Sequence, residues 1–506
     1  MSKTSNNNSI FKVIAASSVG TLIEWYDFYI FGSLAFIISG KFFPQDNPTA
    51  AFLSTLATFA AGFVVRPFGA LVFGRLGDLI GRKYTFMLTL LLMGGATFLI
   101  GCVPSFETIG YLAPFLVLIL RLLQGLALGG EYGGAATYVA EHAPANRRGY
   151  YTSWIQTTAT AGLFISLMVI LVTKTVLSAD DFDAWGWRVP FWVSIIMVLV
   201  SYIIRQKMHE SPLFAKAKAE GKIVKNPLKE SFGNKYNLKF VLLALFGAVM
   251  GQGVIWYTGQ FYAMNFIQKV CNVNSIQTDS LVAIALLMAT PFFVVFGGLS
   301  DRIGRKSIML AGMLLAILTY RPIYKNIFEI TDISTKTELS DKQVINNTIE
   351  NKDDKTIAHY KVLTHYDDGT VATKDSVITT NNISQSKTVK TAFSIELAST
   401  DKWKLIWLVF IQVIYVTMVY GPIAAFLVEM FPVNIRYTSM SLPYHVGNGI
   451  FGGLLPMVAT YLVTNAQMSG ASDWYLNGLW YPIIIACISF VIGLVYLSRK
   501  NIQTHD

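Results

Sequence analysis

Five ionisable side chains in the first, second and fourth long apolar segments are candidates for function, because a charge in such a segment is costly. In the first segment, Glu24 and Asp27 are three residues apart and lie on neighbouring faces of a helix. Arg66 lies in the second segment, and Arg121 and Glu131 lie in the fourth. Carboxyl groups bind and release protons, and guanidinium groups bind anions. These residue types together predict a polar site at which proton binding and anion binding compete.

Asp27 is the first choice for the group that couples solute movement to proton movement, with Glu24 and Glu131 as further proton-binding acids. Arg66 and Arg121 are assigned to binding an anionic solute. When a solute carboxylate occupies an arginine, the acid that the arginine had neutralised is free to take up a proton. In the alternative interpretation, the same residues form a fixed lattice of ion pairs between helices.

Polar and aromatic side chains without a charge form a second set. In the seventh segment, Gln252, Trp256 and Gln260 repeat every four residues and share one helical face. Such faces can hydrogen-bond or cage a small organic solute, although they can equally hold one helix to another. The uncharged residues assigned to solute binding are Gln124, Gln252, Trp256, Tyr257, Gln260, His445 and Asn448.

Two charged patterns each occur twice. Gly-x-x-x-Asp-x-x-Gly-Arg-Lys occupies 74–83 and 297–306, and Glu-x-x-Pro-x-x-x-Arg occupies 141–148 and 429–436. Repeats at the ends of membrane-length segments indicate a transporter built from two related bundles. We expect the repeated charges to form a gate, although the basic ones can also serve only to orient the chain in the membrane. The gate residues are Asp78, Arg82, Glu141, Arg148, Asp301, Arg305, Glu429 and Arg436.

The elements that carry these residues are predicted to be membrane-spanning helices. Of 506 residues, 53% are hydrophobic and 14% charged, against about 25% charged in soluble domains. The apolar segments lack the alternation that is typical of a transmembrane barrel. The predicted fold class is an all-α polytopic membrane protein with twelve transmembrane helices. They are placed at 12–38, 52–74, 84–103, 112–138, 152–177, 189–206, 240–267, 280–299, 307–323, 404–428, 437–464 and 478–498.

Lysine and arginine orient the chain. The basic loops, which include the gate motifs, all fall on one side of a twelve-span topology, and this clustering accounts for the net charge of +10. The positive-inside rule places that side and both termini in the cytoplasm. The predicted units are an N-terminal six-helix bundle (1–206), a basic cytoplasmic linker (207–239), the first part of a C-terminal bundle (240–324), a periplasmic insertion (325–402) and the second part of that bundle (403–506).

The insertion explains an unequal spacing between the repeats. The aspartates of the first pattern are 223 residues apart and the glutamates of the second are 288 apart, which leaves 65 extra residues in the second half. Alternation over 358–366, followed by an Asp-Gly turn in 367–370, predicts a β-hairpin in a small β-rich lobe. His359 and His365 could face a metal, but a closed metal site needs more ligands than two. We therefore expect solvated side chains and no metal.

No cofactor is expected. Cys102, Cys271 and Cys487 are scattered and form neither a metal pattern nor a disulfide framework. The glycine-rich turns lack the Lys-Ser/Thr of a phosphate-binding loop, which argues against an ATP-driven pump. No nucleophile and base stand at catalytic spacing, so an enzyme is not expected. A proton gradient is then the energy source.

Several of these motifs carry a family resemblance. The pattern at 74–83 resembles a loop signature of the major facilitator superfamily, and 121–125 resembles its fourth-span motif, whose arginine is implicated in proton coupling. Four further motifs together resemble the metabolite:proton symporter family, which includes proline/betaine, α-ketoglutarate, shikimate and citrate transporters. These motifs are Glu24-Trp25-Tyr26-Asp27-Phe28, Arg66-Pro67, Gly129-Gly130-Glu131-Tyr132-Gly133-Gly134 and Trp185-Gly186-Trp187-Arg188-Val189-Pro190-Phe191.

The resemblance implies the major facilitator fold, with two six-helix bundles, and proton-coupled import of a small carboxylate or zwitterion across a bacterial inner membrane. The expected partners are this solute, protons and the lipid bilayer, with no nucleic acid and with the chain as a monomer. The insertion departs from the family pattern, in which that loop is short. An uncoupled uniporter, an efflux antiporter and a receptor-like sensor that uses 325–402 are the alternatives.

Overall fold

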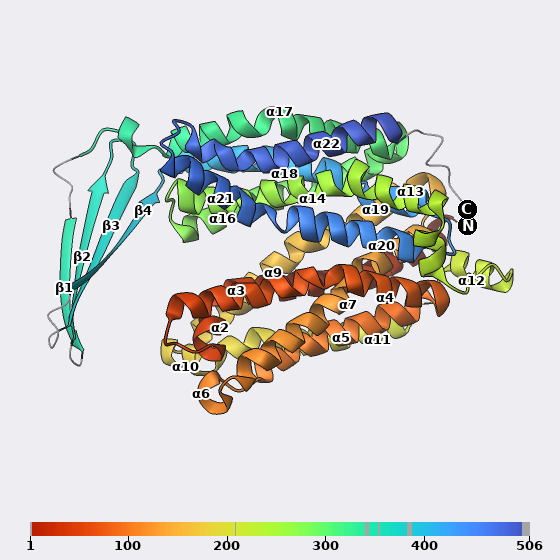
Figure 1. Cartoon of the computed structure of the whole chain (residues 1–506), viewed down its shortest axis with the longest axis horizontal. Helices are drawn as coiled ribbons and strands as arrows, with labels where there is room; N and C mark the ends of the chain where they lie inside the picture. Colours follow the sequence, from red (N-terminus) through yellow and green to blue (C-terminus); the bar gives the residue numbers. More distant parts are fainter. Residues whose placement is uncertain (1–2, 208, 340–343, 353–354, 382–386, 498–506) are drawn as a thin grey trace.

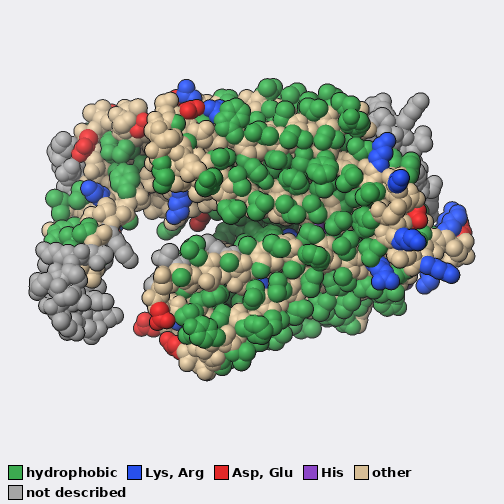
Figure 2. Space-filling view, viewed as in Figure 1, with side chains coloured by type: hydrophobic (Ala, Val, Ile, Leu, Met, Phe, Trp, Pro, Cys, Tyr) green, Lys and Arg blue, Asp and Glu red, His purple; other side chains and the backbone are tan. Residues whose placement is uncertain are grey.

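The computed structural model describes residues 3–207, 209–339, 344–352, 355–381 and 387–497. Two helical bundles lie side by side, and a β-sheet extends from one end of the second bundle (Figure 1). We call this end of the molecule the sheet end. The opposite end carries the turn between α4 and α5 and is called the basic end, because lysines and arginines gather there (Figure 2).

The first bundle is built from the N-terminal part of the chain. Its helices are α1 (Lys3–Ser33), α2 (Ala35–Phe42), α3 (Pro48–Val64), α4 (Arg66–Leu79), α5 (Arg82–Cys102), α6 (Phe106–Ile109), α7 (Leu112–His142), α8 (Arg148–Ser153), α9 (Thr158–Val176), α10 (Ala179–Ala184) and α11 (Val189–Gln206). Short 3-10 turns η1 (Ala145–Arg147), η2 (Trp154–Thr157) and η3 (Gly186–Arg188) connect some of them.

The second bundle follows α12 (Pro212–Ala219) and η4 (Lys229–Gly233). One long helix combines α13 (Lys235–Ala244), η5 (Leu245–Val249), α14 (Met250–Tyr257), η6 (Thr258–Tyr262), α15 (Ala263–Asn265) and η7 (Phe266–Val270). The others are α16 (Ser275–Ile303), α17 (Arg305–Thr331), α18 (Ser399–Tyr420), α19 (Ile423–Met430), α20 (Arg436–Val446), η10 (Gly447–Gly452), α21 (Leu455–Met468), η11 (Trp474–Leu479) and α22 (Trp480–Tyr496), with η8 (Ile333–Thr335) after α17.

Eleven of the described helices, several made of consecutive elements, are long and apolar enough to cross a membrane. The 31-residue α1 is not among them, but it packs against α5, α7, α9 and α11 inside the first bundle. With α1 included, the described chain has the twelve helices that the sequence predicts. Apolar side chains cover the flanks of both bundles, as expected for surfaces that face lipid (Figure 2).

Segments of π-helical geometry interrupt two neighbouring helices of the second bundle. They are η5, η6 and η7 in the helix 235–270, and η10 in the helix 436–468. A Cβ atom on Gly253 would lie 2.8 Å from the carbonyl oxygen of Gly447, so only glycine permits this close approach. Short π-helical segments within α-helices are frequent at functional sites. Both of these helices supply side chains to the cavity described below.

The insertion forms a four-stranded antiparallel sheet in the order β1 (Val344–Lys352), β2 (Lys355–His365), β3 (Val371–Asn381) and β4 (Lys387–Glu396). The turn between β2 and β3 contains Gly369 at φ 90°, and the Tyr366 N–H donates to the Thr370 carbonyl oxygen at 2.9 Å. The predicted β-hairpin is therefore confirmed. His359 and His365 are six positions apart in β2, which corresponds to about 20 Å of extended strand.

The sheet is attached to the second bundle at both of its ends. The Asn274 N–H donates to the Ile395 carbonyl oxygen at 2.8 Å, and the Ile395 N–H donates to the Asn272 carbonyl oxygen at 2.7 Å. At the other end, α17 continues to Thr331, seven residues into the segment predicted as insertion. Ile327 in this extension is fully buried, so the apolar helical face simply continues beyond the predicted span.

Candidate functional site

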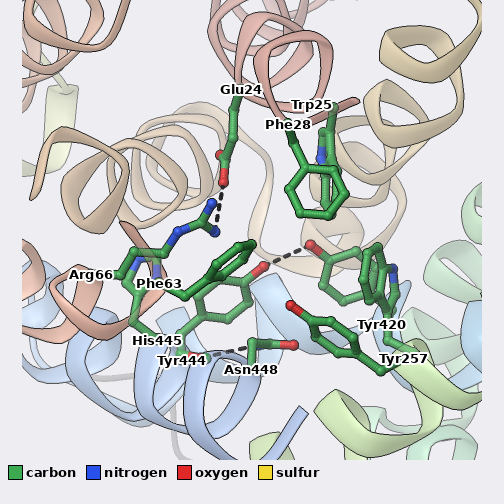
Figure 3. Close-up of a pocket in the computed structure, with 12 residues that line it drawn as sticks. Glu24, Trp25, Phe28, Phe63, Arg66, Tyr257, Tyr420, Tyr444, His445 and Asn448 are labelled. Atoms are coloured by element: carbon green, nitrogen blue, oxygen red, sulfur yellow. Dashed lines mark hydrogen bonds and ion pairs between the residues drawn. The ribbon is translucent and has the colours of Figure 1, made fainter. Parts of the chain in front are cut away.

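A small cavity of about 40 Å³ lies between the two bundles (Figure 3). It brings together one of the predicted acids, one of the predicted arginines and four of the predicted uncharged residues. The first bundle contributes Glu24, Trp25, Phe28, Phe63 and Arg66, and the second contributes Trp256, Tyr257, Tyr420, Tyr444, His445, Asn448 and Gly449.

The charged part of the cavity is an ion pair between Arg66 and Glu24, with Nη1 and Oε1 3.3 Å apart (Figure 3). Arg66 stands at the break between α3 and α4, where Pro67 is tolerated because the first helical turn needs no N–H donor at that position. Its guanidinium carbon lies 4.4 Å from the centre of the Phe63 ring. Arg66 Nε is buried and has no hydrogen-bond partner among the described residues. The guanidinium group therefore retains donor capacity for a ligand.

Two nitrogen atoms of residues that line the cavity have no hydrogen-bond partner in the described chain. Trp256 Nε1 and His445 Nε2 make no hydrogen bond, although the two residues are only 3% and 2% exposed. Buried polar atoms in folded proteins are almost always hydrogen-bonded to protein, water or ligand. The Arg66 guanidinium and the Trp256 N–H therefore retain donor capacity.

The remaining polar groups of the cavity are held by protein partners. Asn448 and Gln252 exchange two side-chain hydrogen bonds of 3.1 Å, so Gln252 orients Asn448 instead of lining the cavity. The hydroxyl groups of Tyr420 and Tyr444 are 2.6 Å apart. These bonds fix the ring and amide positions before any solute binds.

Aromatic rings separate the cavity from a wider vestibule toward the sheet end. Trp25 and Trp256 lie with ring centres 5.0 Å apart, and Phe28 meets Phe261 edge-on at 5.4 Å. The vestibule holds about 420 Å³, and Phe28 lines both compartments. Gln260, predicted to bind solute, lines the vestibule and not the cavity. A recess between the bundles is visible on this side (Figure 2).

On the side toward the basic end, tyrosines close the cavity. The ring of Tyr132 in α7 stacks on that of Tyr444 in α20, with centres 3.8 Å apart and planes 5° from parallel. Gln156 Nε2 donates to the Tyr132 hydroxyl at 2.7 Å. The two bundles are therefore in van der Waals contact immediately below the cavity.

Asp27 does not line the cavity but lies within the first bundle, in a cluster with Thr97, Gln124 and Arg121. Thr97 Oγ1 donates to Asp27 Oδ2 at 2.6 Å, and Gln124 Nε2 donates to the same oxygen at 3.4 Å. Arg121 donates to Gln124 Oε1 and lies over the rings of Phe31 and Phe59. Gln124 thus links the acid to the arginine. Asp27 Oδ1 is buried and makes no hydrogen bond within the described chain.

Glu131 also lies away from the cavity. Arg205 Nη2 is 2.5 Å from Glu131 Oε1, and Thr89 Oγ1 donates to Glu131 Oε2 at 2.8 Å. Both charged side chains are fully buried. A buried pair of this kind, in which both Glu131 oxygens are bonded, favours the alternative interpretation for Glu131, a fixed ion pair between helices. Arg205 was not singled out from the sequence, although its position inside the predicted span 189–206 could have marked it.

At the basic end, the first repeated motif joins the bundles in a pseudo-symmetric way. Asp78 accepts hydrogen bonds at 2.8 and 3.3 Å from two backbone N–H groups in the first turn of α20, in the other bundle. Asp301 accepts bonds at 2.9 and 2.8 Å from two backbone N–H groups in the first turn of α8, again in the other bundle. Each carboxylate therefore caps a helix of the opposite bundle at its positive end.

The arginine of the first motif extends this network. Arg82 pairs with Asp78 at 3.1 Å and with Glu141 at 3.4 Å, and Arg436 reaches from the second bundle to Glu141 at 3.3 Å. The preceding Gly81 has φ 122°, a conformation that a residue with a side chain rarely adopts. The glycine of the motif is therefore needed to turn Arg82 into the network.

The second motif repeats the arrangement. Arg305 pairs with Asp301 at 2.5 Å and with Glu429 at 2.8 Å. Arg148 Nε donates to the carbonyl oxygen of Ala140 at 3.2 Å. All eight residues predicted for the gate thus lie at the basic end, and their bonds across the interface hold this end closed.

Sequence reasoning missed the aromatic half of the site. Trp25, Phe28, Phe63 and Tyr420 line the cavity but were not predicted to do so. For Trp25 and Phe28 a signal existed, since they flank the two acids in 24–28 and share their helical faces. Phe63 and Tyr420 lie in apolar segments that offer no comparable marker.

Known proteins resemble this chain over most of its length. The family described as "Sugar (and other) transporter" matches residues 12–235. The inner membrane metabolite transport protein YhjE of Escherichia coli (strain K12) is 32% identical over 490 residues, which cover 95% of this chain and 94% of that protein. The citrate-proton symporter of Klebsiella pneumoniae is 29% identical over 484 residues, 95% of this chain and 90% of that protein. The proton:xylose symporter XylE shares the fold, with a TM-score of 0.68, 16% identity and coverage of 99% of this chain and 98% of its own.

Proposed function

The chain belongs to the metabolite:proton symporter family of the major facilitator superfamily, and we propose that it imports a small organic carboxylate or zwitterion together with protons. Transport proceeds by alternating access across a bacterial inner membrane. The basic end faces the cytoplasm, in line with the positive-inside rule, and the sheet lies outside. The proton gradient supplies the energy for this import, without any bound cofactor.

The observation that carries this proposal is a cavity enclosed between the bundles, in which the Glu24–Arg66 ion pair lies among aromatic rings. An ion pair and helix caps join the bundles at the basic end, and the aromatic contacts of Trp25 with Trp256 and of Phe28 with Phe261 stand between the cavity and the vestibule. This is the arrangement of a carrier that is closed toward the cytoplasm and ready to admit a solute from outside.

In the proposed binding mode, the solute carboxylate bonds to Arg66. It then competes with Glu24, whose carboxylate is 3.3 Å from Arg66 in the empty cavity. A carboxylate that loses its counter-charge in a poorly solvated space gains by binding a proton. Solute binding and protonation of Glu24 therefore support each other.

Asp27 is proposed to carry the coupled proton. It lies one helical turn from Glu24 and has no direct ion pair in the described chain, since Gln124 stands between it and Arg121. The unpartnered Oδ1 is satisfied more easily in a neutral carboxyl group than in a carboxylate. Neutralising Asp27 also lets Gln124 and Arg121 relax toward the rings of Phe31 and Phe59, which connects proton binding to the wall of the vestibule.

The test separates coupling from binding in purified protein reconstituted in liposomes. With Asp27→Asn we expect exchange of labelled solute across the membrane at more than half the wild-type rate, because exchange needs no net proton movement. Accumulation driven by an imposed pH gradient should be lost. The panel of solutes is glycine betaine, proline, shikimate, α-ketoglutarate and citrate. Wild-type accumulation by Asp27→Asn would remove Asp27 from the proposed mechanism, and equal loss of exchange and accumulation would assign it to binding or folding.

A further inference from the structure

The vestibule carries a charge of its own. Of its lining residues that the structure describes, Asp279 is the one with a full charge, and it lies near the start of α16 at the sheet end. The side chain is exposed to the vestibule, unlike the buried charges of the cavity and gate. Its charge therefore acts on any solute before that solute reaches the aromatic contacts.

Asp279 is held in place by a neighbouring helix. Gln268 Nε2 in η7 donates to Asp279 Oδ1 at 3.0 Å, which leaves Oδ2 for a ligand. The start of α16 is fixed as well, because Asn274 Oδ1 accepts bonds from the N–H groups of Ile276 and Gln277 at 2.9 and 3.3 Å. The carboxylate is thus positioned by the fold rather than free to swing away.

Aromatic rings line the same compartment as this carboxylate. Phe28, Tyr29, Phe59 and Phe261 line the vestibule together with Asp279. A carboxylate combined with the faces of aromatic rings suits an ammonium or quaternary ammonium group. The same carboxylate repels a second negative charge on an anionic solute.

Along the path from outside to the cavity, the sign of the charge reverses. A solute meets Asp279 first, then the ring contact of Phe28 with Phe261, and finally Arg66. A zwitterion that advances with its carboxylate inward is attracted at both ends of this path, with its ammonium group trailing near Asp279. A dicarboxylate is attracted only by Arg66, and the negative charge of Asp279 repels it.

We propose that Asp279 is a specificity-determining residue, which forms a first binding subsite for the ammonium group of the solute and selects zwitterions against dianions. The inference rests on the proposed transport function and narrows its substrate class. Nothing in it depends on the direction or number of coupled protons.

The test compares glycine betaine with α-ketoglutarate in wild type, Asp279→Asn and Asp279→Lys. Asparagine keeps an acceptor for Gln268 but removes the charge. Asp180→Asn is the matched control, since Asp180 is an exposed acid at the same end that does not line the vestibule. Binding is followed by the fluorescence of Trp25 and Trp256, and uptake by initial rates at low and at physiological salt. Size-exclusion profiles verify that each variant is folded.

We expect wild type to favour glycine betaine. Asp279→Asn should raise KM for glycine betaine about two- to tenfold with kcat little changed, and should lower the KM for α-ketoglutarate. Asp279→Lys should raise the ratio of the KM for glycine betaine to the KM for α-ketoglutarate further. Higher salt should reduce all these differences in KM, because it screens the charges. Asp180→Asn should behave as wild type.

Three results would overturn the inference. One is a wild type that prefers α-ketoglutarate, which leaves proton-coupled import itself intact. Another is an Asp279→Asn variant with the wild-type ratio of the two solutes. The third is a wild type whose fluorescence shows binding of neither solute. This result would contradict both the proposed substrate class, a carboxylate or zwitterion, and the role of Asp279. Uptake without proton movement would contradict only the coupling mechanism, and the ratio would still report on Asp279.

Discussion

Removing the charge of Asp78 should weaken the closed gate by a predictable amount. Asp78 is fully buried, and its two oxygens accept from two different N–H groups of α20, at 2.8 and 3.3 Å. In Asp78→Asn one of these oxygens becomes an NH₂ group, so one N–H loses its acceptor and the other keeps only a neutral one. A hydrogen bond to a charged group contributes about 1.5–3 kcal/mol and a neutral one about 1 kcal/mol.

The closed state of this end therefore loses roughly 2–4 kcal/mol, whereas the open state, in which α20 has moved away, loses nothing. Every 1.4 kcal/mol changes an equilibrium constant tenfold. The fraction of molecules open at the basic end should rise roughly 30- to 1000-fold while that fraction remains small. Arg82 retains Glu141 as a partner at 3.4 Å, so the variant does not leave it buried without a counter-charge.

A cysteine at the interface reports on this opening. Ser441 is fully buried against Gly133 of the other bundle, and Ser441→Cys is a small change. In a background with the native cysteines replaced, a membrane-impermeant maleimide is applied to the basic end in inside-out vesicles. We expect Asp78→Asn to raise the labelling rate at least tenfold, and Asp301→Asn, at the equivalent cap, to do the same.

Asp473→Asn is the control, because Asp473 pairs with Arg321 at 2.7 Å at the sheet end and does not join the bundles. The reasoning is refuted if Asp78→Asn labels no faster than this control while eluting as folded protein. Faster labelling in Asp78→Asn but not in Asp301→Asn would instead refute the pseudo-symmetry of the two caps.

Three further outcomes are expected. Arg66→Gln should raise the KM for carboxylate solutes more than tenfold with less effect on thermal stability, and Arg66→Lys should recover only part of the affinity because the bidentate fork is lost; unchanged KM would exclude contact with the solute. Glu131→Gln should lower the free energy of unfolding by about 3–5 kcal/mol, because Arg205 is left buried without its partner, and the folded fraction should still couple protons; retained melting temperature with lost coupling would reverse this assignment. In the sheet, partial burial raises the pKa of Asp368, but the hydrogen bond from Lys336 outweighs it and holds the pKa below its ordinary value. The ion pair should therefore stabilise the turn above about pH 4 and be lost as the pH falls through the lowered pKa, which hydrogen exchange of 366–370 would show; protection that is independent of pH would contradict it.

The architecture was accessible from sequence because its signals are long and periodic. The membrane-length apolar segments predicted twelve helices. The two repeated motifs predicted that the gate residues lie at one end of them. The β-hairpin of the insertion followed from an Asp-Gly turn between alternating residues. The end of α17 was misplaced, because Ile327 continues the buried face beyond the point where charged residues reappear.

The site was only partly accessible, because helix rotation and depth decide which polar residue meets which. Glu24 and Asp27 are three residues apart, yet one lines the cavity and the other lies inside the first bundle. The ion pair of Glu131 with Arg205 could not be predicted, because the two residues are 74 positions apart in the sequence. That Trp256 Nε1 and His445 Nε2 have no hydrogen-bond partner in the described chain is visible only in three dimensions.

The most direct test of proton-coupled import is solute-induced proton movement in liposomes that contain purified protein and a pH-sensitive dye. Addition of glycine betaine or α-ketoglutarate outside, with no imposed gradient, should acidify the interior as solute enters, and the signal should vanish with Asp27→Asn. Solute that equilibrates without any pH change would contradict symport and favour a uniporter. Alkalinisation of the interior during solute uptake would indicate exchange of solute for protons, and the coupling assigned to Asp27 and Glu24 would then be wrong.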